Sequence, residues 1–223
     1  AKNIYYTLDG SDPLFSNSRI LYEEPIRISA QTDRVPVMSQ IDPFFFDAAH
    51  VELNQSKDGF VGTLMAPKKE NVDQIAVVRA VAEDKKETYS KTQTESFFLG
   101  TMEEHIQGIA ESCEAAGQDL AVLSLSINYE DLFDYDTGIY VKGAHYQNEL
   151  KKKINFNEKL DEEVSRALNA NYKQKGREWE REIHLELFEA SQNGATQVLS
   201  QSCGIRVQGN YSRSDLQKGL RLY

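Results

Sequence analysis

Along the first hundred residues, apolar and polar side chains alternate in short segments rich in Val, Ile, Tyr and Phe. Segments of Asp, Gly, Ser and Pro separate them, as in Asp9-Gly10-Ser11-Asp12-Pro13. A period of two between turn residues indicates β-strands. The predicted strands cover residues 4–8, 20–28, 59–65, 75–82 and 94–99. Several short strands joined by turns are typical of a β-sandwich.

The pattern changes to a helical period over residues 101–117. Apolar residues recur there every three or four positions, on one face of a helix: Met102, Ile106, Ile109, Ala110 and Cys113. Thr101 and Glu104 have the spacing of a capping box, and Gly117 stands where helices commonly end. We predict a connecting helix between a first domain, residues 1–100, and a second part, residues 118–223.

The second part also reads as β-rich, with a few helices. Strands are predicted over residues 120–127, 139–141, 178–187, 203–208 and 217–223, and a surface helix within 145–171. The fold class is therefore mainly β. Because the first and last residues both read as strands, we expect the chain to be a piece of a longer protein.

Composition narrows the function classes. The 223 residues hold 35 acidic and 25 basic side chains, a net charge of −10 that argues against a nucleic-acid partner. No segment approaches the ~20 apolar residues of a membrane span. Two cysteines are too few for a disulfide scaffold or a structural zinc site. Cys113 is interpreted as a buried structural thiol, and whether it pairs with Cys203 stays open.

The Asp134-x-Asp136-x-Gly138 segment suggests calcium at first sight. An EF-hand loop counted from Asp134 needs Gly at its sixth position and Glu at its twelfth, where this chain has Ile139 and His145. We therefore interpret the segment as a turn held by Asx hydrogen bonds, with a looser calcium site as the alternative.

Glutamates occupy one parity of the predicted strand 178–187, and residues two apart on a strand share a face. They are Glu178, Glu180, Glu182 and Glu186. A carboxylate pair on one face could serve glycoside hydrolysis. Arg177, Arg181 and His184 are interleaved with the glutamates, which favours a solvated strand face, with His184 as a surface residue.

Residues 204–223 carry four basic side chains and one acidic one, a net +3 within an acidic chain. The glycines Gly204 and Gly209 and the Asn210-Tyr211-Ser212 turn could cradle a phosphate with backbone donors. A Walker loop is excluded, because its Gly-Lys-Ser/Thr is missing. The alternative, which the spacing alone favours, is a basic hairpin that pairs with the acidic strand.

Aromatic side chains near the start of the chain are candidates for sugar binding. Tyr5 and Tyr6 point to opposite faces of one strand, so one of them, or Phe15, could form a stacking platform. The alternative is a tyrosine covered by the loop at residues 33–58, which is the favoured interpretation.

The first hundred residues resemble a known module. Residues 4–13, Leu21-Tyr22-Glu23-Glu24-Pro25-Ile26-Arg27-Ile28, residues 78–82 and the closing 92–100 are similar to the chitobiase/β-hexosaminidase C-terminal-type module. This resemblance implies a small immunoglobulin-like β-sandwich without catalytic activity, found on secreted bacterial proteins.

Residues 120–223 resemble the leading segment of CotH kinase-family proteins. The matching motifs are residues 123–126, 131–143, 176–181, 184–188, Gly204-Ile205-Arg206-Val207-Gln208-Gly209, Ser212-Arg213 and Gln217-Lys218. By this resemblance Arg206, Gly209, Ser212, Arg213 and Lys218 border a nucleotide. Leu216-Gln217-Lys218-Gly219 stands where the family usually has Pro-Gln-Lys-Ser, a departure within that turn.

The resemblance implies ATP and Mg²⁺ or Mn²⁺ as cofactors of the parent protein, and coat or cell-surface proteins as partners. The catalytic acids of such kinases lie downstream of Tyr223, so we expect no cofactor, no metal site and no catalytic residue in this chain. The expected function is that of a non-catalytic accessory fragment, extracellular or at the cell surface or spore coat. The alternative is a module that binds polysaccharide. The sequence leaves the ligand, the phospho-acceptor and the oligomeric state open.

Overall fold

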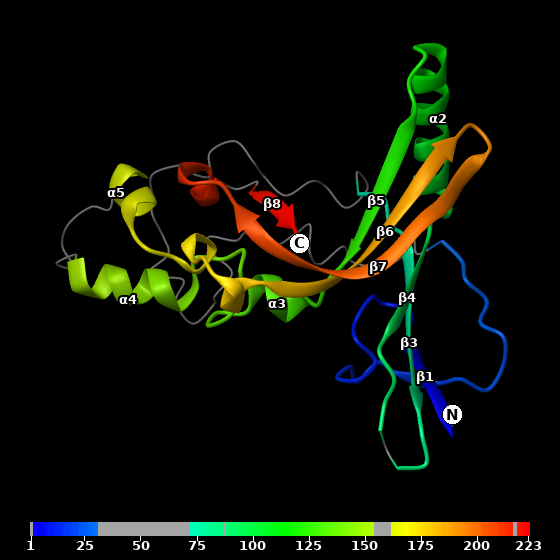
Figure 1. The fold of residues 1–223 in the computed structure, drawn as a ribbon, viewed down its shortest axis with the longest axis horizontal. Helices are drawn as coiled ribbons and strands as arrows, with labels where there is room; N and C mark the ends of the chain where they lie inside the picture. Colours follow the sequence, from blue (N-terminus) through cyan, green and yellow to red (C-terminus); the bar gives the residue numbers. More distant parts are fainter. Residues whose placement is uncertain (1, 31–71, 87, 154–161, 216–217) are drawn as a thin grey trace. The chain divides into compact units, whose positions relative to one another are not determined.

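The computed structural model describes residues 2–30, 72–86, 88–153, 162–215 and 218–223 (Figure 1). The chain is mainly β with a few helices, as predicted. It divides into two compact units. The first holds the described residues of Ala1–Pro36, Lys69–Asn128 and Ile183–Cys203, and the second those of Val37–Lys68, Tyr129–Glu182 and Gly204–Tyr223. The helix predicted over 101–117 lies inside the first unit, and the predicted division into 1–100 and 118–223 stays a prediction.

The first unit contains a four-stranded antiparallel sheet of order β2-β1-β3-β4. Its strands are β1 (Asn3–Thr7), β2 (Ile20–Leu21), β3 (Ala76–Glu83) and β4 (Gln93–Phe97). Three predicted strands are confirmed. The strand predicted over 20–28 is wrong beyond its first two residues, because residues 22–30 form no strand. The candidate strand 59–65 lies outside the described residues.

Alternation along these strands separates two faces of the first sheet. Thr7, Val81 and Thr94 are buried on one face, while Ile4, Tyr22 and Ile20 are exposed on the other. The buried face is partly polar, so this sheet depends on hydrogen bonds as well as on apolar packing.

Helix α2 (Thr101–Ala115) follows the first sheet and lies beside strand β5 (Leu120–Ser126). The helix ends as predicted. Gly117 has φ +69°, its N–H donates to the carbonyl of Glu114, and Gln118 N–H donates to Cys113, a Schellman motif. The predicted capping box is wrong, because Gly100 is the N-cap and no side chain caps the first turn.

The apolar face of α2 is narrower than predicted. Ile106 and Ala110 are buried, but Ile109 is 53% exposed. Cys113 is half-buried and free, as is Cys203. The prediction placed Ile109 on the buried face of the helix, but one neighbouring strand does not cover that residue.

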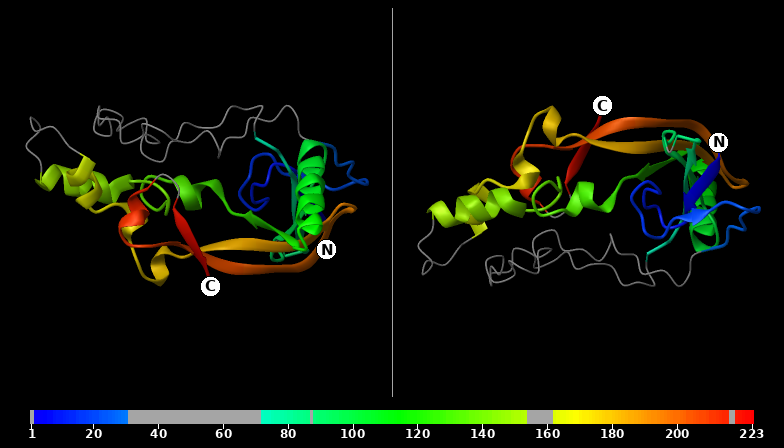
Figure 2. Two further views of the ribbon diagram at one scale, coloured as in Figure 1. Left: turned by 90° about the horizontal axis from the view of Figure 1, so that it is seen from above. Right: turned by 90° about the horizontal axis from the view of Figure 1, so that it is seen from below.

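The second sheet has the order β5-β6-β7-β8. After β5 come β6 (Arg181–Ser191), β7 (Gly194–Gln208) and β8 (Gly219–Leu222). Strands β6 and β7 form a long hairpin that is visible in every view (Figure 2). The predicted pairing of 203–208 with 217–223 is confirmed: Arg206 faces Arg221 across β7 and β8. The first half of β7 was not predicted, because its sequence is polar.

Short helices make up most of the rest of the described part of the second unit. They are α3 (Tyr129–Phe133), α4 (Gly143–Lys153), α5 (Glu162–Ala167) and the 3-10 turns Asn171–Lys173, Arg177–Trp179 and Tyr211–Ser214. The predicted surface helix within 145–171 is thus two helices in the described residues. The predicted strand 139–141 is wrong. Ile139 and Val141 are buried, but Ile139 N–H donates to Asp131 and Tyr140 N–H to Leu132, in the turn that follows α3.

The Asp134 turn is confirmed as an Asx turn. Asp134 Oδ1 accepts hydrogen bonds from Asp136 N–H at 2.9 Å, and from Thr137 N–H at 2.8 Å and Oγ1 at 2.9 Å. These donors, Thr137 N–H first, lower the pKa of Asp134. Within the described residues, no group of three or more His, Cys, Asp or Glu side chains is placed to hold a metal ion.

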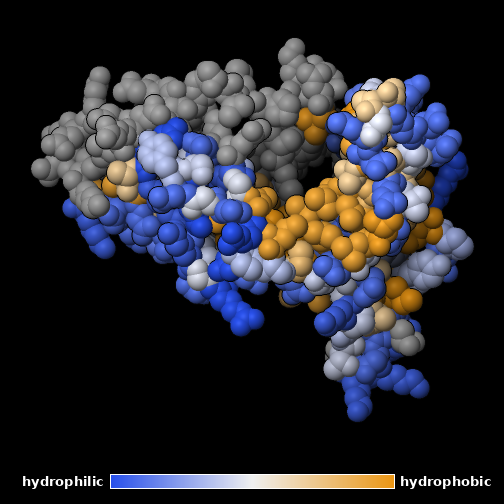
Figure 3. All heavy atoms as spheres, turned by 45° about the horizontal axis from the view of Figure 1, so that its top comes forward, coloured by the Kyte–Doolittle hydropathy of each residue, from blue (hydrophilic) through white to orange (hydrophobic). Residues whose placement is uncertain are grey.

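Part of the second sheet belongs to the first unit, and several apolar side chains there are exposed. They are Leu123 and Leu125 on β5 and Val198 and Leu199 on β7. Figure 3 shows apolar side chains gathered on the molecular surface. None of the described helices has the length and apolar composition needed to cross a membrane.

Candidate functional site

The five residues predicted to border a nucleotide all lie in the second unit, from the last part of β7 to the residue before β8. Arg206 is on β7, Gly209 follows that strand, Ser212 and Arg213 belong to the 3-10 turn, and Lys218 precedes β8. All five lie within residues 206–218, the stretch that leads from β7 to its antiparallel neighbour β8. Their side chains, however, have different surroundings.

Arg206 contacts groups of its own chain. Its Nε lies 3.5 Å from Glu180 Oε2, and its Cζ lies 3.7 Å from the ring centroid of Tyr223. A Cβ at Gly204 would overlap the Glu180 side chain, so the glycine lets that carboxylate lie against β7. The alternative to a phosphate cradle was a basic hairpin that pairs with the acidic strand. This ion pair is one contact of that kind.

Arg213 holds a neighbouring loop. Its Nε donates to the Gly209 carbonyl at 2.7 Å, and its Nη1 donates to the carbonyls of Gln174 at 2.8 Å and Tyr172 at 3.3 Å. Partial burial lowers the pKa of Arg213, and the positive charge of Arg206 acts in the same direction. The guanidinium therefore joins two segments about forty residues apart.

Lys218 is a buried lysine whose charge is stabilised by oxygen and aromatic rings. Its ammonium donates to the Asp215 carbonyl and lies 4.5 Å and 4.8 Å from the ring centroids of Tyr172 and Tyr140. Burial raises the pKa of Tyr172, so this ring stays neutral. A carbonyl and two ring faces are a reasonable set of partners for a buried ammonium.

Gly209 and Ser212 shape the turn. Gly209 has φ +114°, a conformation that side chains disfavour, and a Cβ there would overlap Ser212 Oγ. Ser212 itself is exposed. The structure thus places Gly209, Ser212 and Arg213 against one another. Arg206 and Lys218 contact other residues of the chain.

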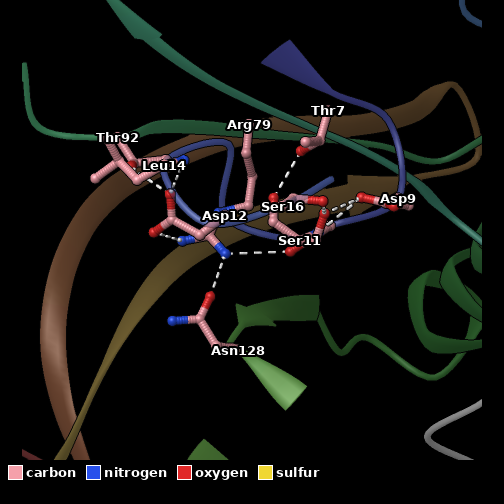
Figure 4. A network of polar contacts seen from close by, with 10 residues as sticks. Thr7, Asp9, Ser11, Asp12, Leu14, Ser16, Arg79, Thr92 and Asn128 are labelled. Atoms are coloured by element: carbon pink, nitrogen blue, oxygen red, sulfur yellow. Dashed lines mark hydrogen bonds and ion pairs between the residues drawn. The ribbon is translucent and has the colours of Figure 1, made fainter. Parts of the chain in front are cut away.

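A polar network in the first unit was not predicted (Figure 4). Arg79 on β3 is buried, with Nη1 2.7 Å from Asn128 Oδ1 and 3.1 Å from the Gly10 carbonyl, and Nη2 3.3 Å from Asp12 Oδ2. Asp9 accepts hydrogen bonds from Ser11 and Ser18. The sequence signal was the single arginine within the apolar run 77–82.

A second polar cluster centres on Glu186 of β6, which is fully buried. Its carboxylate accepts hydrogen bonds from Ser96 N–H at 3.0 Å, from Ser96 Oγ and from Gln197 Nε2 at 2.8 Å. Ser96 Oγ also lies 2.8 Å from Ser124 Oγ. The predicted solvated face is therefore wrong at Glu186, because β4 of the first sheet covers this position. His184, in contrast, is half-buried and lies 2.9 Å from Ser200 Oγ through its Nε2.

The tyrosines of β1 lie on opposite faces, as predicted. Tyr5 is half-buried, with the Arg19 guanidinium 4.9 Å from its ring centroid. Tyr6 makes an edge-to-face contact with Tyr22 at 6.3 Å, and Tyr22 is 42% exposed. Phe15 is 82% exposed. The predicted cover, the loop 33–58, lies outside the described residues.

Comparison with known proteins addresses the first part of the chain. Residues 1–97 match the family model described as Fn3 associated. Over these residues the chain is similar to that family. The match supports the first half of the predicted resemblance, an accessory β module, and it covers the whole first sheet. No curated protein and no solved structure matches the chain. The CotH likeness of residues 120–223 stays a prediction.

Proposed function

We propose that this chain is a non-catalytic accessory part of a CotH-type, kinase-like protein, in which the Fn3-associated module is fixed firmly to the strands that follow it. The observation that carries the proposal is the Glu186 cluster. A fully buried carboxylate on β6 binds both the backbone and the side chain of Ser96 on β4. An edge-to-face contact between Phe98 and Phe188, 4.8 Å apart, reinforces the same junction.

A buried, hydrogen-bonded carboxylate fixes how β4 and β6 lie against each other, because any shifted arrangement that stays buried leaves the carboxylate or its donors without partners. The module is then a rigid support rather than a loosely tethered domain. The proposed setting is a secreted, surface or spore-coat protein whose partners are coat or cell-surface proteins. ATP and Mg²⁺ or Mn²⁺ belong to the downstream kinase-like domain of the parent.

The contacts of the basic residues support the non-catalytic part of the proposal. Arg213 and Lys218 donate to backbone carbonyls. Phosphoryl transfer needs metal-held phosphates and a positioned base.

The test is a phosphotransfer assay. The chain is incubated with radiolabelled ATP, Mg²⁺ or Mn²⁺ and casein as a general acceptor, next to an active protein kinase as the positive control. We expect no label on the chain or on casein. Robust transfer that scales with the concentration of the chain would overturn the proposal.

A second candidate function, polysaccharide binding, is favoured by one face of the first sheet. Ile4, Tyr6, Ile20 and Tyr22 share this face, and all but Tyr6 are at least 39% exposed. Amphipathic tyrosine rings beside aliphatic side chains can stack on the apolar faces of sugars. Tyr22, which the sequence did not single out, is the most accessible aromatic ring of this group.

Retention on chitin and cellulose tests this candidate. We expect Tyr22→Ala and Tyr6→Ala to abolish retention of the chain, while Tyr5→Ala, on the opposite face, retains it. Failure of the unaltered chain to bind either polymer would contradict the candidate, as would equal retention of all three variants.

A further inference from the structure

Strand β5 forms one edge of the second sheet. Within the described residues it pairs with β6 on one side and with no strand on the other (Figure 1). Along an edge strand, alternate residues direct their backbone N–H and C=O groups away from the sheet, where another extended chain can pair with them. Proteins commonly protect such edges with a charged residue, a Pro or a bulge. Residues 120–128 contain no charged residue, no Pro and no Gly, and the register with β6 is regular.

One face of β5 is apolar and exposed. Leu123 is 56% and Leu125 38% exposed, and residues two apart on a strand lie on the same face. Their cross-strand partners, Leu187 and Leu185, continue the apolar surface on β6. The opposite face is covered at Ser124, whose Oγ lies 2.8 Å from a serine hydroxyl on β4. A strand added at this edge would therefore extend the leucine face.

The surroundings of β5 within the first unit are acidic. Residues 92–128, which include β5 and the helix α2 that packs against it, hold six acidic residues and no Lys or Arg. The acidic residues are Glu95, Glu103, Glu104, Glu111, Glu114 and Asp119. Residues 183–203 of β6 and β7 hold two more, and again no Lys or Arg. One of these, Glu189, is exposed and lies opposite Ala121, on the same face as Leu123.

The first half of β7 is a second uncharged edge of this sheet, because β8 pairs only with Ile205–Gln208 among the described residues. Val198 is 48% and Leu199 40% exposed. These two residues are adjacent in sequence and so point to opposite faces, with polar residues two positions away on either side. This edge lacks the row of exposed apolar side chains that β5 has, and it serves as a control.

We propose that the free edge of β5 binds an extended, basic segment of a partner protein, which adds a strand to the second sheet. Main-chain hydrogen bonds pair the two strands, and alternate apolar side chains of the partner contact Leu123 and Leu125. A Lys or Arg of the partner lies near Glu189. A second copy of this chain is a poorer occupant, because pairing two such edges brings two acidic surfaces together. The inference goes beyond the non-catalytic assignment and does not depend on it.

Isothermal titration of the whole chain tests the inference with a peptide of alternating Val and Lys, as long as β5 and blocked at both ends. We expect this peptide to bind, and we expect replacement of its Lys residues by Glu to weaken binding about tenfold or more. A third peptide carries N-methyl groups on the alternate amides that would face β5. It should not bind, because it cannot donate main-chain hydrogen bonds to the edge.

Two variants of the chain locate the binding site. Leu123→Lys adds a charge to the exposed face of β5 and should weaken binding of the Val/Lys peptide about tenfold. Val198→Lys adds the same charge at a similarly exposed position of β7 and should bind like the unaltered chain. Amide hydrogen exchange followed by NMR gives a direct readout. The peptide should slow exchange in β5 and leave exchange in the first half of β7 unchanged.

No binding of the Val/Lys peptide at millimolar concentration would overturn the inference. Equal binding of the Glu peptide or of the N-methylated peptide would also overturn it, as would equal weakening by the two lysine variants. Sedimentation of the chain alone tests the other occupant. A dimer whose formation protects the β5 amides would assign the edge to a second copy and overturn the proposal. Phosphate transfer by the chain would remove only the non-catalytic assignment.

Discussion

Glu186 lies on a strand whose neighbouring Glu182 and Glu189 are exposed, yet its own side chain is fully buried. Alternation alone assigned it to solvent. Its environment is set by Ser96 and Gln197, which are 90 and 11 residues away in sequence. A buried carboxylate without such donors would be strongly unfavourable.

Replacing Glu186 should therefore destabilise the chain. We expect Glu186→Ala to lower the free energy of unfolding by about 3 kcal/mol, because it leaves buried donors unpaired. Glu186→Gln keeps an acceptor and should cost about 1 kcal/mol. Urea denaturation measures both. Glu189→Ala, at an exposed position of the same strand, is the control and should change stability by less than about 0.5 kcal/mol. Equal midpoints for the two alanine variants would contradict this role of Glu186.

Among the structural elements, those whose hydrogen bonds are local were predicted best. The end of α2 and the Asp134 turn depend on residues within five positions of one another. The strand predicted over 139–141 was wrong. Ile139 and Val141 alternate with Tyr140 as residues of a strand do, but the backbone N–H groups of Ile139 and Tyr140 form hydrogen bonds in the turn after α3. Periodicity shows which side chains are buried but not which backbone groups pair.

The Asp134 turn predicts a pH dependence. Its lowered pKa means that the ionised carboxylate stabilises the folded chain at pH values above the ordinary pKa, near 4, and that this stabilisation is lost as the pH falls through the lower folded value. Asp134→Ala should therefore be less stable than the unaltered chain at neutral pH, with the difference shrinking below about pH 4. Thermal unfolding across this range measures it. Asp136→Ala, which removes an exposed carboxylate two residues away, is the matched control and should stay close to the unaltered chain in stability at neutral pH.

For the molecule as a whole, the segment that matches the Fn3-associated family, residues 1–97, shares its stabilising contacts with later parts of the first unit. Ser96 binds Glu186, and Arg79 binds Asn128, so residues 1–97 lack partners for both when excised. We expect the excised module to unfold at least about 10 °C below the intact chain, measured by circular dichroism. Removing only residues 219–223 should leave amide exchange of β3 unchanged. An excised module as stable as the intact chain would contradict the rigid-support proposal.

The sequence by itself determined the mainly β class, most strands of the first sheet, the end of α2, the Asx turn and the match of residues 1–97 to a known module. These features depend on periodicity and turn chemistry, which are local. Only the tertiary structure decided that Glu186 is buried and that Arg213 and Lys218 donate to carbonyls. Each of these features depends on which backbone and side-chain groups lie within hydrogen-bonding distance in the folded chain. A linear pattern of residues does not contain that information.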